Sequence, residues 1–137
     1  MAVPYLACMT LVASLYHLPP RVLPSIQMVE GGASGTVHRN AGGSDDYGVM
    51  QINEVWLPSL AAYTGLPPGV VRDRLILWPC FNIAAAGAIL RTYLNETHGD
   101  LMLAIGNYHS HTNALNRAYR TKVMQSASQL FAPAAQH

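Results

Sequence analysis

The stretch RVLPSIQMVEGG, residues 21–32, combines a helical pattern with one carboxylate and two glycines at its end. Its apolar residues recur at the spacing of one helix face: Val22, Leu23, Ile26 and Val29. This spacing predicts a helix from about Arg21 to Glu30 that is anchored in the core. Gly31-Gly32 then ends the helix, because glycine readily adopts the left-handed conformation that closes one.

Further helices are expected on both sides of this stretch. Apolar residues cluster at helical spacing from Val3 to His17, and Pro19-Pro20 breaks that pattern. Later helices are expected after a cap at Asn53, from Pro67-Pro68, from Cys80 to about Glu96, from Leu101 to about Tyr108 after a cap at Asp100, and from Thr112 or Asn113 onward. Periodicity is lost from Ser126 to His137, which predicts a frayed tail.

The segment after Glu30 is the least helical part of the chain. It is rich in Gly, Ser, Asn and Asp, and a short β-type stretch around Thr36 to Arg39 predicts an ordered loop or a small β-hairpin. With 137 residues, the chain is long enough for one core and too short for two ordinary domains. We therefore expect a mainly α fold, a single compact domain over residues 1–137 with its core at about 4–125.

The composition argues against several classes of protein. Only 11% of residues are charged and the formal net charge is +1, so nucleic-acid binding is disfavoured. The apolar residues 2–16 contain Pro4 and are too few to span a bilayer as a helix, so stable membrane insertion is not expected. His109 and His111 form a pair without a clear third ligand, so we expect neither a metal nor another cofactor.

Two cysteines, Cys8 and Cys80, lack the spacing of a CxxC or metal-binding motif. From spacing alone, two buried thiols and one disulfide are both open. A bridge would stabilise the fold by roughly 4 kcal/mol through chain entropy, and it would require an oxidising compartment.

Carboxylates are scarce enough to be weighed one by one. Of the seven, only Glu30 ends a strongly apolar helix beside glycines. Four others are interpreted as structural, in first helical turns or beside basic residues: Glu54, Asp73, Glu96 and Asp100. Burial at a helix end raises the pKa of a Glu above its reference of about 4.3, as a proton donor at neutral pH requires. A solvated surface carboxylate is the alternative for Glu30.

Three stretches resemble the motifs of the soluble lytic transglycosylase family, which has a lysozyme-like α+β fold. They are VEGG (29–32), YGVMQIN (47–53) and AIGNY (104–108), beside family patterns written approximately E-S-G, G-L-M-Q-I and A-x-x-Y-N. The likeness is strongest to the small single-domain branch associated with conjugation, pilus and type III or type IV secretion systems. It spans roughly Tyr5 to Met124 and includes both cysteines.

The resemblance implies an enzyme that cleaves the β-1,4 bond between N-acetylmuramic acid and N-acetylglucosamine in peptidoglycan. The product would carry a 1,6-anhydro ring on its muramoyl end. Glu30 would act as the single catalytic acid and base, helped by the acetamido group of the substrate. Such cleavage would open the cell wall locally for assembly of a secretion or conjugation apparatus.

The resemblance also assigns substrate-binding residues. Gln51 would hydrogen-bond the glycan, and Met50 would pack against a sugar face, although core filling suits Met50 equally. The hydroxyl of Tyr108 would orient Glu30 or the sugar, with a buried core aromatic as the alternative. Matching motif positions add Tyr47, Asn53 and Asn107.

The resemblance to the same branch also implies how the cysteines pair and where the protein is located. Its cysteines occupy matching places, which implies a Cys8–Cys80 disulfide in the periplasm, reached by secretion across the inner membrane with a signal peptide not visible in this numbering. Expected partners are peptidoglycan glycan strands and components of a secretion, pilus or conjugation machine. The protein itself is expected to be a monomer.

Two departures from the family pattern keep alternatives open. Gly31 stands where the family has serine, and His109-Ser110-His111 stands in place of Asn-Ala-Gly. If Asp45 or Asp46 held a water opposite Glu30, the protein would be a hydrolytic muramidase on the same fold; otherwise both are turn residues. A catalytically weak, glycan-binding assembly protein is the other alternative.

Overall fold

Residues 3–132 are described by the structure, a computed structural model, and they are mainly helical, as predicted. The helices are α1 (Leu6–Leu15), α2 (Val22–Glu30), α3 (Leu57–Thr64), α4 (Pro68–Leu77), α5 (Pro79–Glu96), α6 (Leu101–His109) and α7 (Asn113–Leu130), with a short 3-10 helix η1 (Glu54–Trp56) before α3. The strands are β1 (Val37–Arg39), β2 (Asp45–Tyr47) and β3 (Ile52–Asn53).

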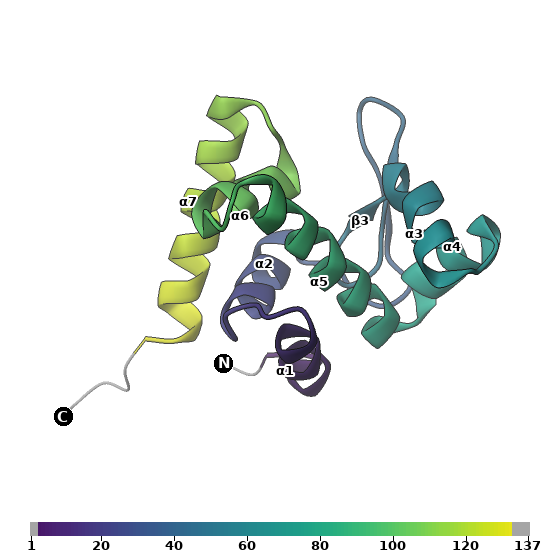
Figure 1. Cartoon of the computed structure of the whole chain (residues 1–137), viewed down its shortest axis with the longest axis horizontal. Coiled ribbons are helices and arrows are strands. Elements are labelled where there is room, and N and C mark those ends of the chain that lie inside the picture. Colours follow the sequence, from purple (N-terminus) through teal and green to yellow (C-terminus); the bar gives the residue numbers. More distant parts are fainter. Residues whose placement is uncertain (1–2, 133–137) are drawn as a thin grey trace.

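Helix α5 runs through the middle of the molecule, with the sheet, α3 and α4 towards one end and α6 and α7 towards the other (Figure 1). Its buried residues are mostly aliphatic or small, so neighbours can approach closely. A Cβ on Gly87 would overlap Val12 of α1, so α1 packs directly on the α5 backbone there. No single helix of the described part is long and apolar enough to cross a bilayer. Helices α4 and α5 together have the length and composition of a span, but the chain bends by 110° between them.

Helix α2 follows the prediction closely. Leu23 and Ile26 are fully buried, and Gly31 ends the helix in the left-handed conformation with φ 67°. The amide of Gly31 donates to the carbonyl of Gln27 at 2.7 Å, which closes the last turn. Glu30 is therefore held at the last turn of a helix whose opposite face is fixed in the core.

Helix α7 continues further than expected, to Leu130, so the prediction of fraying from Ser126 is wrong for that part of the tail. The reason is a contact with α2: Ser126 is buried, and its hydroxyl donates to the carbonyl of Ser25 at 2.9 Å. Tyr119 and Val123 are buried on the same helix. Residues 133–137, the end of the predicted tail, lie outside the described residues.

The first helix is shorter than the predicted Val3–His17. Tyr5, directly after Pro4, adopts a left-handed conformation with φ 59°, and the helix begins at Leu6. His17, with φ 54°, lies beyond its other end. The predicted cap at Asn53 is present, since its side chain accepts from the amide of Val55 at 3.0 Å, but it caps η1.

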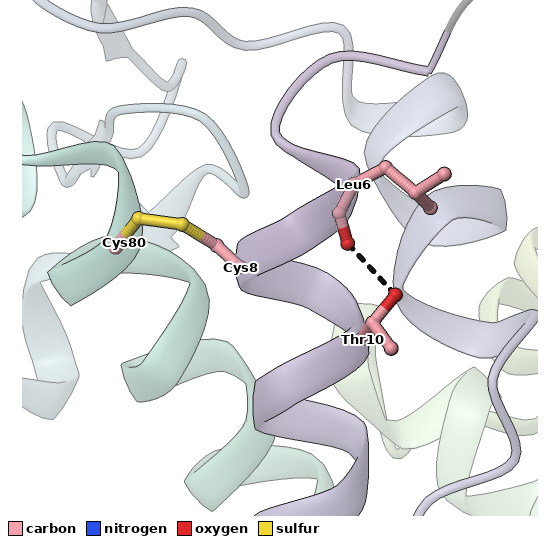
Figure 2. Close-up of a disulfide and its surroundings, with 4 residues drawn as sticks. All are labelled: Leu6, Cys8, Thr10 and Cys80. Atoms are coloured by element: carbon pink, nitrogen blue, oxygen red, sulfur yellow. Dashed lines mark hydrogen bonds between the residues drawn. A yellow bond between two sulfur atoms is a disulfide. The ribbon is translucent and has the colours of Figure 1, made fainter.

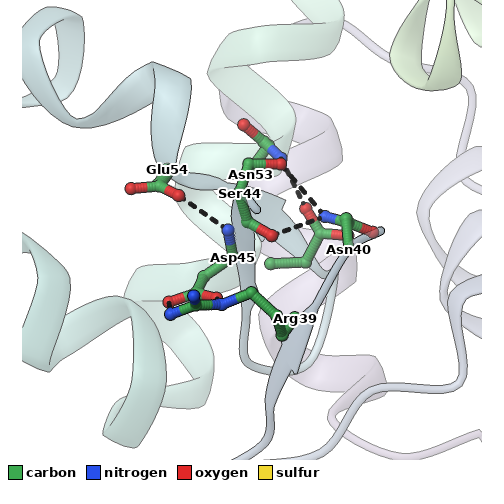
Figure 3. A network of polar contacts seen from close by, with 7 residues as sticks. Arg39, Asn40, Ser44, Asp45, Asn53 and Glu54 are labelled. Atoms are coloured by element: carbon green, nitrogen blue, oxygen red, sulfur yellow. Dashed lines mark hydrogen bonds and ion pairs between the residues drawn. The ribbon is translucent and has the colours of Figure 1, made fainter. Parts of the chain in front are cut away.

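The predicted hairpin is present and gains a third strand. The sheet is antiparallel with order β1-β2-β3, and Val37 pairs with Tyr47, which pairs with Ile52. Figure 3 shows the polar contacts that fix it: the guanidinium of Arg39 pairs with Asp45 at 2.5 Å, and the amide of Asp45 donates to the carboxylate of Glu54 at 2.8 Å. These contacts hold the loop after Glu30 in one register.

A disulfide joins Cys8 of α1 to Cys80 at the start of α5, across 72 residues of sequence (Figure 2). The two Cα atoms are 5.5 Å apart, within the usual range for a bridge. The bond ties the first helix to the central one, so it restricts most of the unfolded chain.

Replacing both Cys8 and Cys80 by Ser is expected to lower the free energy of unfolding by about 2–4 kcal/mol, because the unfolded chain regains loop entropy. Urea denaturation of the oxidised wild type and the double variant measures the difference. Wild type treated with a reducing agent should match the double variant. Equal midpoints in the oxidised wild type and the variant would show that the bridge contributes nothing.

Candidate active site

Glu30 lies where two cavities meet. One, of about 350 Å³, is bounded by the sheet, η1, α5 and α6. The other, of about 260 Å³, lies against α7 and shares Glu30 and His109 with the first. Because the carboxyl group faces space on both sides, a polymer can pass it with units bound before and after the reacting bond.

Two glycines bring the end of α2 against the segment 47–51. A Cβ on Gly32 would overlap the main-chain oxygen of Gly48, and one on Gly48 would overlap the main-chain oxygen of Leu75. Gly48 also has φ 70°, which glycine adopts without strain. The first two motifs of the sequence therefore meet in space, and Gln51 comes to line the same cavity as Glu30.

The carboxyl group of Glu30 has a strongly altered acidity. Burial raises its pKa from the ordinary 4.5 to about 7, since a charged carboxylate is poorly solvated there. The hydroxyl of Tyr119 donates to Oε2 at 2.5 Å and opposes this by stabilising the charged form, whereas the negative charge of Asp46 adds to it. A pKa raised to about 7 allows part of the Glu30 population to stay protonated at neutral pH.

The two aspartates after the loop have different surroundings. Asp45, on the central strand β2, pairs with the exposed side chain of Arg39 on the edge strand β1 (Figure 3). Asp46 lines the larger cavity together with Glu30, and its Oδ1 accepts from the amide of Asn53 at 2.9 Å. Of the pair, only Asp46 faces the space beside Glu30.

Tyr108 lines the cavity beside Glu30, but its hydroxyl is directed to another partner. Its hydroxyl donates to the carbonyl of Met50 at 2.9 Å, and burial raises its pKa well above the usual value, so the phenol stays neutral. Tyr108 was expected to orient Glu30 or the sugar. The hydrogen bond to Glu30 comes instead from Tyr119 of α7, and an interaction of Tyr108 with the sugar stays a prediction. Sequence analysis did not assign Tyr119 to the site; the signal that could have found it is that a buried tyrosine needs a partner for its hydroxyl.

Tyr47 and Met50, both assigned to substrate binding, do not line the cavity, and the structure matches the alternative of core filling that was left open for Met50. Their exposed fractions are 2% and 0%, and their side chains fill the core. Their main chains matter more, because the Asn82 amide donates to the carbonyl of Tyr47 at 2.8 Å and its Oδ1 accepts from the amide of Met50 at 2.8 Å. Asn82 therefore holds the turn between Tyr47 and Met50, and sequence analysis did not single it out.

Three predicted amide side chains line the cavity with Glu30: Gln51, Asn53 and Asn107. The Gln51 side chain donates to the carbonyl of Gly48 at 3.0 Å. Asn53 donates to the hydroxyl of Ser44 at 3.1 Å (Figure 3). Oδ1 of Asn107 accepts from Asn116 at 2.9 Å, which positions it from α7. Each amide is thus oriented by the protein on one side of the cavity.

The positions that depart from the family pattern have structural explanations. Gly31 adopts φ 67°, a conformation in which serine would be strained. His109 stacks on the ring of Tyr119, with centroids 5.0 Å apart, and His111 contacts Glu96 at 2.8 Å. Within residues 3–132, no group of three or more His, Cys, Asp or Glu side chains is arranged to hold a metal ion.

Residues 8–131 match the family described as Transglycosylase SLT domain. The chain belongs to this family. The resemblance seen in the sequence is confirmed, and the domain indicates a function that acts on peptidoglycan. Two similar curated proteins are both named Protein IpgF: one from Shigella sonnei is 29% identical over 124 residues, covering 88% of this chain and 78% of the relative. The other, from Shigella flexneri, is 30% identical over 108 residues, covering 78% and 67%.

Replacing Tyr119 by Phe tests the contact with Glu30. The lost hydroxyl stabilised the charged carboxylate, so the pKa of Glu30 should rise above about 7 and the alkaline limb of the pH–rate profile should move upward. Looser positioning should lower the rate by about 10-fold. Tyr5→Phe, which removes a phenolic hydroxyl that does not line these cavities, is the control. A profile identical to wild type would exclude this role for Tyr119.

Proposed function

We propose that this protein is a lytic transglycosylase that cleaves the β-1,4 bond between N-acetylmuramic acid and N-acetylglucosamine and leaves a 1,6-anhydromuramoyl end. One observation carries the proposal: a half-buried carboxyl group, with its pKa raised to about 7, lies at the junction of two cavities. A group of that acidity is partly protonated at neutral pH, and it can both give and take a proton there.

In the proposed first step, protonated Glu30 donates to the glycosidic oxygen while the bond from that oxygen to C1 of the muramoyl sugar breaks. The acetamido oxygen of the same sugar stabilises the positive charge at C1. In the second step, the Glu30 carboxylate accepts the proton of the 6-hydroxyl as that oxygen bonds to C1. Glu30 ends protonated and no water is consumed, so one carboxyl group serves both steps.

The neighbouring side chains have supporting parts in this proposal. The hydroxyl of Tyr119 fixes Oε2 of Glu30 and stabilises the carboxylate formed between the steps. The amides of Gln51, Asn53 and Asn107 provide hydrogen-bonding groups for the glycan in the larger cavity. Because Tyr47 and Met50 are buried, we assign them the support of this cavity and no sugar contact.

A second candidate is a hydrolytic muramidase, and the position of Asp46 favours considering it. Its carboxylate lines the same cavity as Glu30. A carboxylate on the opposite side of the sugar can activate a water, which then attacks C1 and gives a reducing end. The two candidates differ in the product, since an anhydro end is lighter by one water.

Mass spectrometry of digested peptidoglycan separates the two reactions. We expect anhydro ends from the wild type and also from Asp46→Asn, because Asp46 has no covalent or proton-transfer role in our mechanism. The alkaline limb of the Asp46→Asn profile should move to lower pH, since the charge of Asp46 helps to raise the pKa of Glu30. Reducing ends from the wild type, lost in Asp46→Asn, would favour the muramidase instead.

We further propose that the protein acts in the periplasm as a monomer and opens peptidoglycan locally for a secretion, pilus or conjugation machine. The disulfide supports an oxidising compartment. The motif resemblance to the small branch supports the link with such a machine. Oxidation of Cys8 and Cys80 in protein isolated from the periplasmic fraction is the direct check; free thiols there would contradict it.

A further inference from the structure

Next to the Glu30 cavity lies another cavity, of about 300 Å³, on the side of η1 and α3. The two share Trp56 and Ile89 as lining residues, so they adjoin at these side chains. Its other walls come from Tyr16, directly after α1, and from α3 and α5. A glycan strand that extends from Glu30 past Trp56 would reach this second space.

The walls of this space are aromatic and apolar. Trp56, Tyr16 and Tyr63 line it, while Ser59 and Ala88 have small side chains that leave it open. Tyr63 is 68% exposed, so its side chain is accessible to a bound partner. Its hydroxyl and that of Tyr16 are 3.1 Å apart and hydrogen-bonded, so the ring is held in place. Fixed aromatic faces of this kind suit the apolar face of a sugar ring.

Arg91 adds a positive charge to the same walls. Its Nη1 donates to the carbonyls of Tyr16 and His17, at 3.3 and 3.5 Å, while its Nε is buried without a hydrogen-bond partner. Across residues 3–132, no carboxylate forms an ion pair with this guanidinium. The group is thus held by neutral carbonyls alone, and its charge suits a carboxylate, which a guanidinium binds through paired hydrogen bonds.

We propose that this space, the Tyr63–Arg91 subsite, binds a second muramoyl unit of the strand that Glu30 cleaves. The sugar ring packs against Trp56 and Tyr63, and a carboxylate of that unit pairs with Arg91. In peptidoglycan that carboxylate belongs either to the stem peptide or, where the peptide has been removed, to the lactyl group. The inference rests on the proposed function, and it adds a preference for carboxylate-bearing glycan over uncharged chitin.

Binding to the non-cleaving Glu30→Gln protein tests the subsite. The probes are uncrosslinked peptidoglycan strands with stem peptides, the same strands stripped of peptide, and a chito-oligosaccharide without carboxylates. Adding Tyr63→Ala should weaken binding of all three by about 5- to 10-fold. Adding Arg91→Gln should lower the affinity for the carboxylate-bearing strands by about 10-fold and leave the affinity for the chito-oligosaccharide unchanged. An effect restricted to peptide-bearing strands identifies the stem carboxylate; an effect on stripped strands identifies the lactyl group.

Matched controls and a second Arg91 variant keep the result interpretable. Trp78→Ala and Arg117→Gln change an exposed aromatic and an exposed cation away from the subsite, and affinity should not change. Arg91→Lys keeps the charge and should bind carboxylate-bearing strands better than Arg91→Gln. If the Arg91 variants only lower the melting temperature and leave every affinity unchanged, Arg91 merely caps α1 and the subsite is refuted. Failure of the wild type to cleave peptidoglycan would instead refute the proposed function.

Discussion

Replacing Glu30 by Gln is expected to lower the rate of peptidoglycan cleavage by at least about 1,000-fold. Gln has nearly the same shape, but its amide neither protonates a glycosidic oxygen nor accepts the proton of a hydroxyl. Tyr119 can still donate to the amide oxygen, so the cavity should keep its form. Release of soluble fragments from purified peptidoglycan measures the rate. Asp73→Asn makes the same chemical change at an exposed carboxylate on α4 and should leave the rate unchanged.

The same variant distinguishes the enzyme from a catalytically weak glycan-binding protein. For an enzyme, Glu30→Gln should keep strand binding and lose cleavage. If the wild type binds strands and cleaves no faster than the variant, the assembly-protein alternative is favoured.

Stability against pH gives an independent check on this variant. Folding raises the pKa of Glu30 from 4.5 to about 7, so the free energy of unfolding depends on pH through this group. The contribution of the Glu30 carboxyl group to stability is complete below pH 4.5 and is lost as the pH rises through 7. At pH 8, Glu30→Gln should therefore be more stable than the wild type by up to about 3 kcal/mol. At pH 4 the two proteins should differ little.

Asn82→Ala is expected to lower the free energy of unfolding by about 3–5 kcal/mol. Asn82 has an exposed fraction of 0%, and its side chain makes three hydrogen bonds of 2.8 Å to main-chain groups of Tyr47, Leu75 and Met50. Truncation leaves all three groups buried without a partner and also creates a cavity. Each unsatisfied group costs about 1–3 kcal/mol before relaxation.

Urea denaturation measures the loss, with Asn95→Ala at an exposed position of the same helix as the control. A change below about 1 kcal/mol in Asn82→Ala would contradict the role assigned to these bonds. Because Asn82 holds the turn that carries Gln51 into the cavity, the variant should also lose activity at temperatures where it remains folded.

Helix α2 and the position of Glu30 at its end could be predicted because the signals were local. An apolar stripe marks the buried face, and Gly31 marks the end of the helix. The strand β3 could not be predicted in the same way, since it has two residues and depends on pairing with β2. The extension of α7 depends likewise on the distant contact between Ser126 and Ser25.

The motif resemblance could indicate which stretches of the chain meet at the candidate site, but it could not indicate in which direction each side chain points. Tyr47 and Met50 belong to a motif at the cavity, yet their side chains point into the core. Tyr108 and Tyr119 are both tyrosines near Glu30, and only the folded arrangement of α6 and α7 decides which hydroxyl reaches the carboxylate. Asn82 acts over a distance of 32 residues, beyond any local pattern.

The most direct measurement is a titration of the Glu30 side chain itself. The carbon-13 chemical shift of its carboxyl group, assigned by comparison with Glu30→Gln, gives the pKa in the free protein. We expect a midpoint of about 7, the value that lets one group donate and then accept a proton at neutral pH. A midpoint near the ordinary 4.5 would mean that Glu30 is already ionised when it meets the glycan, and the proposed chemistry would have no proton donor.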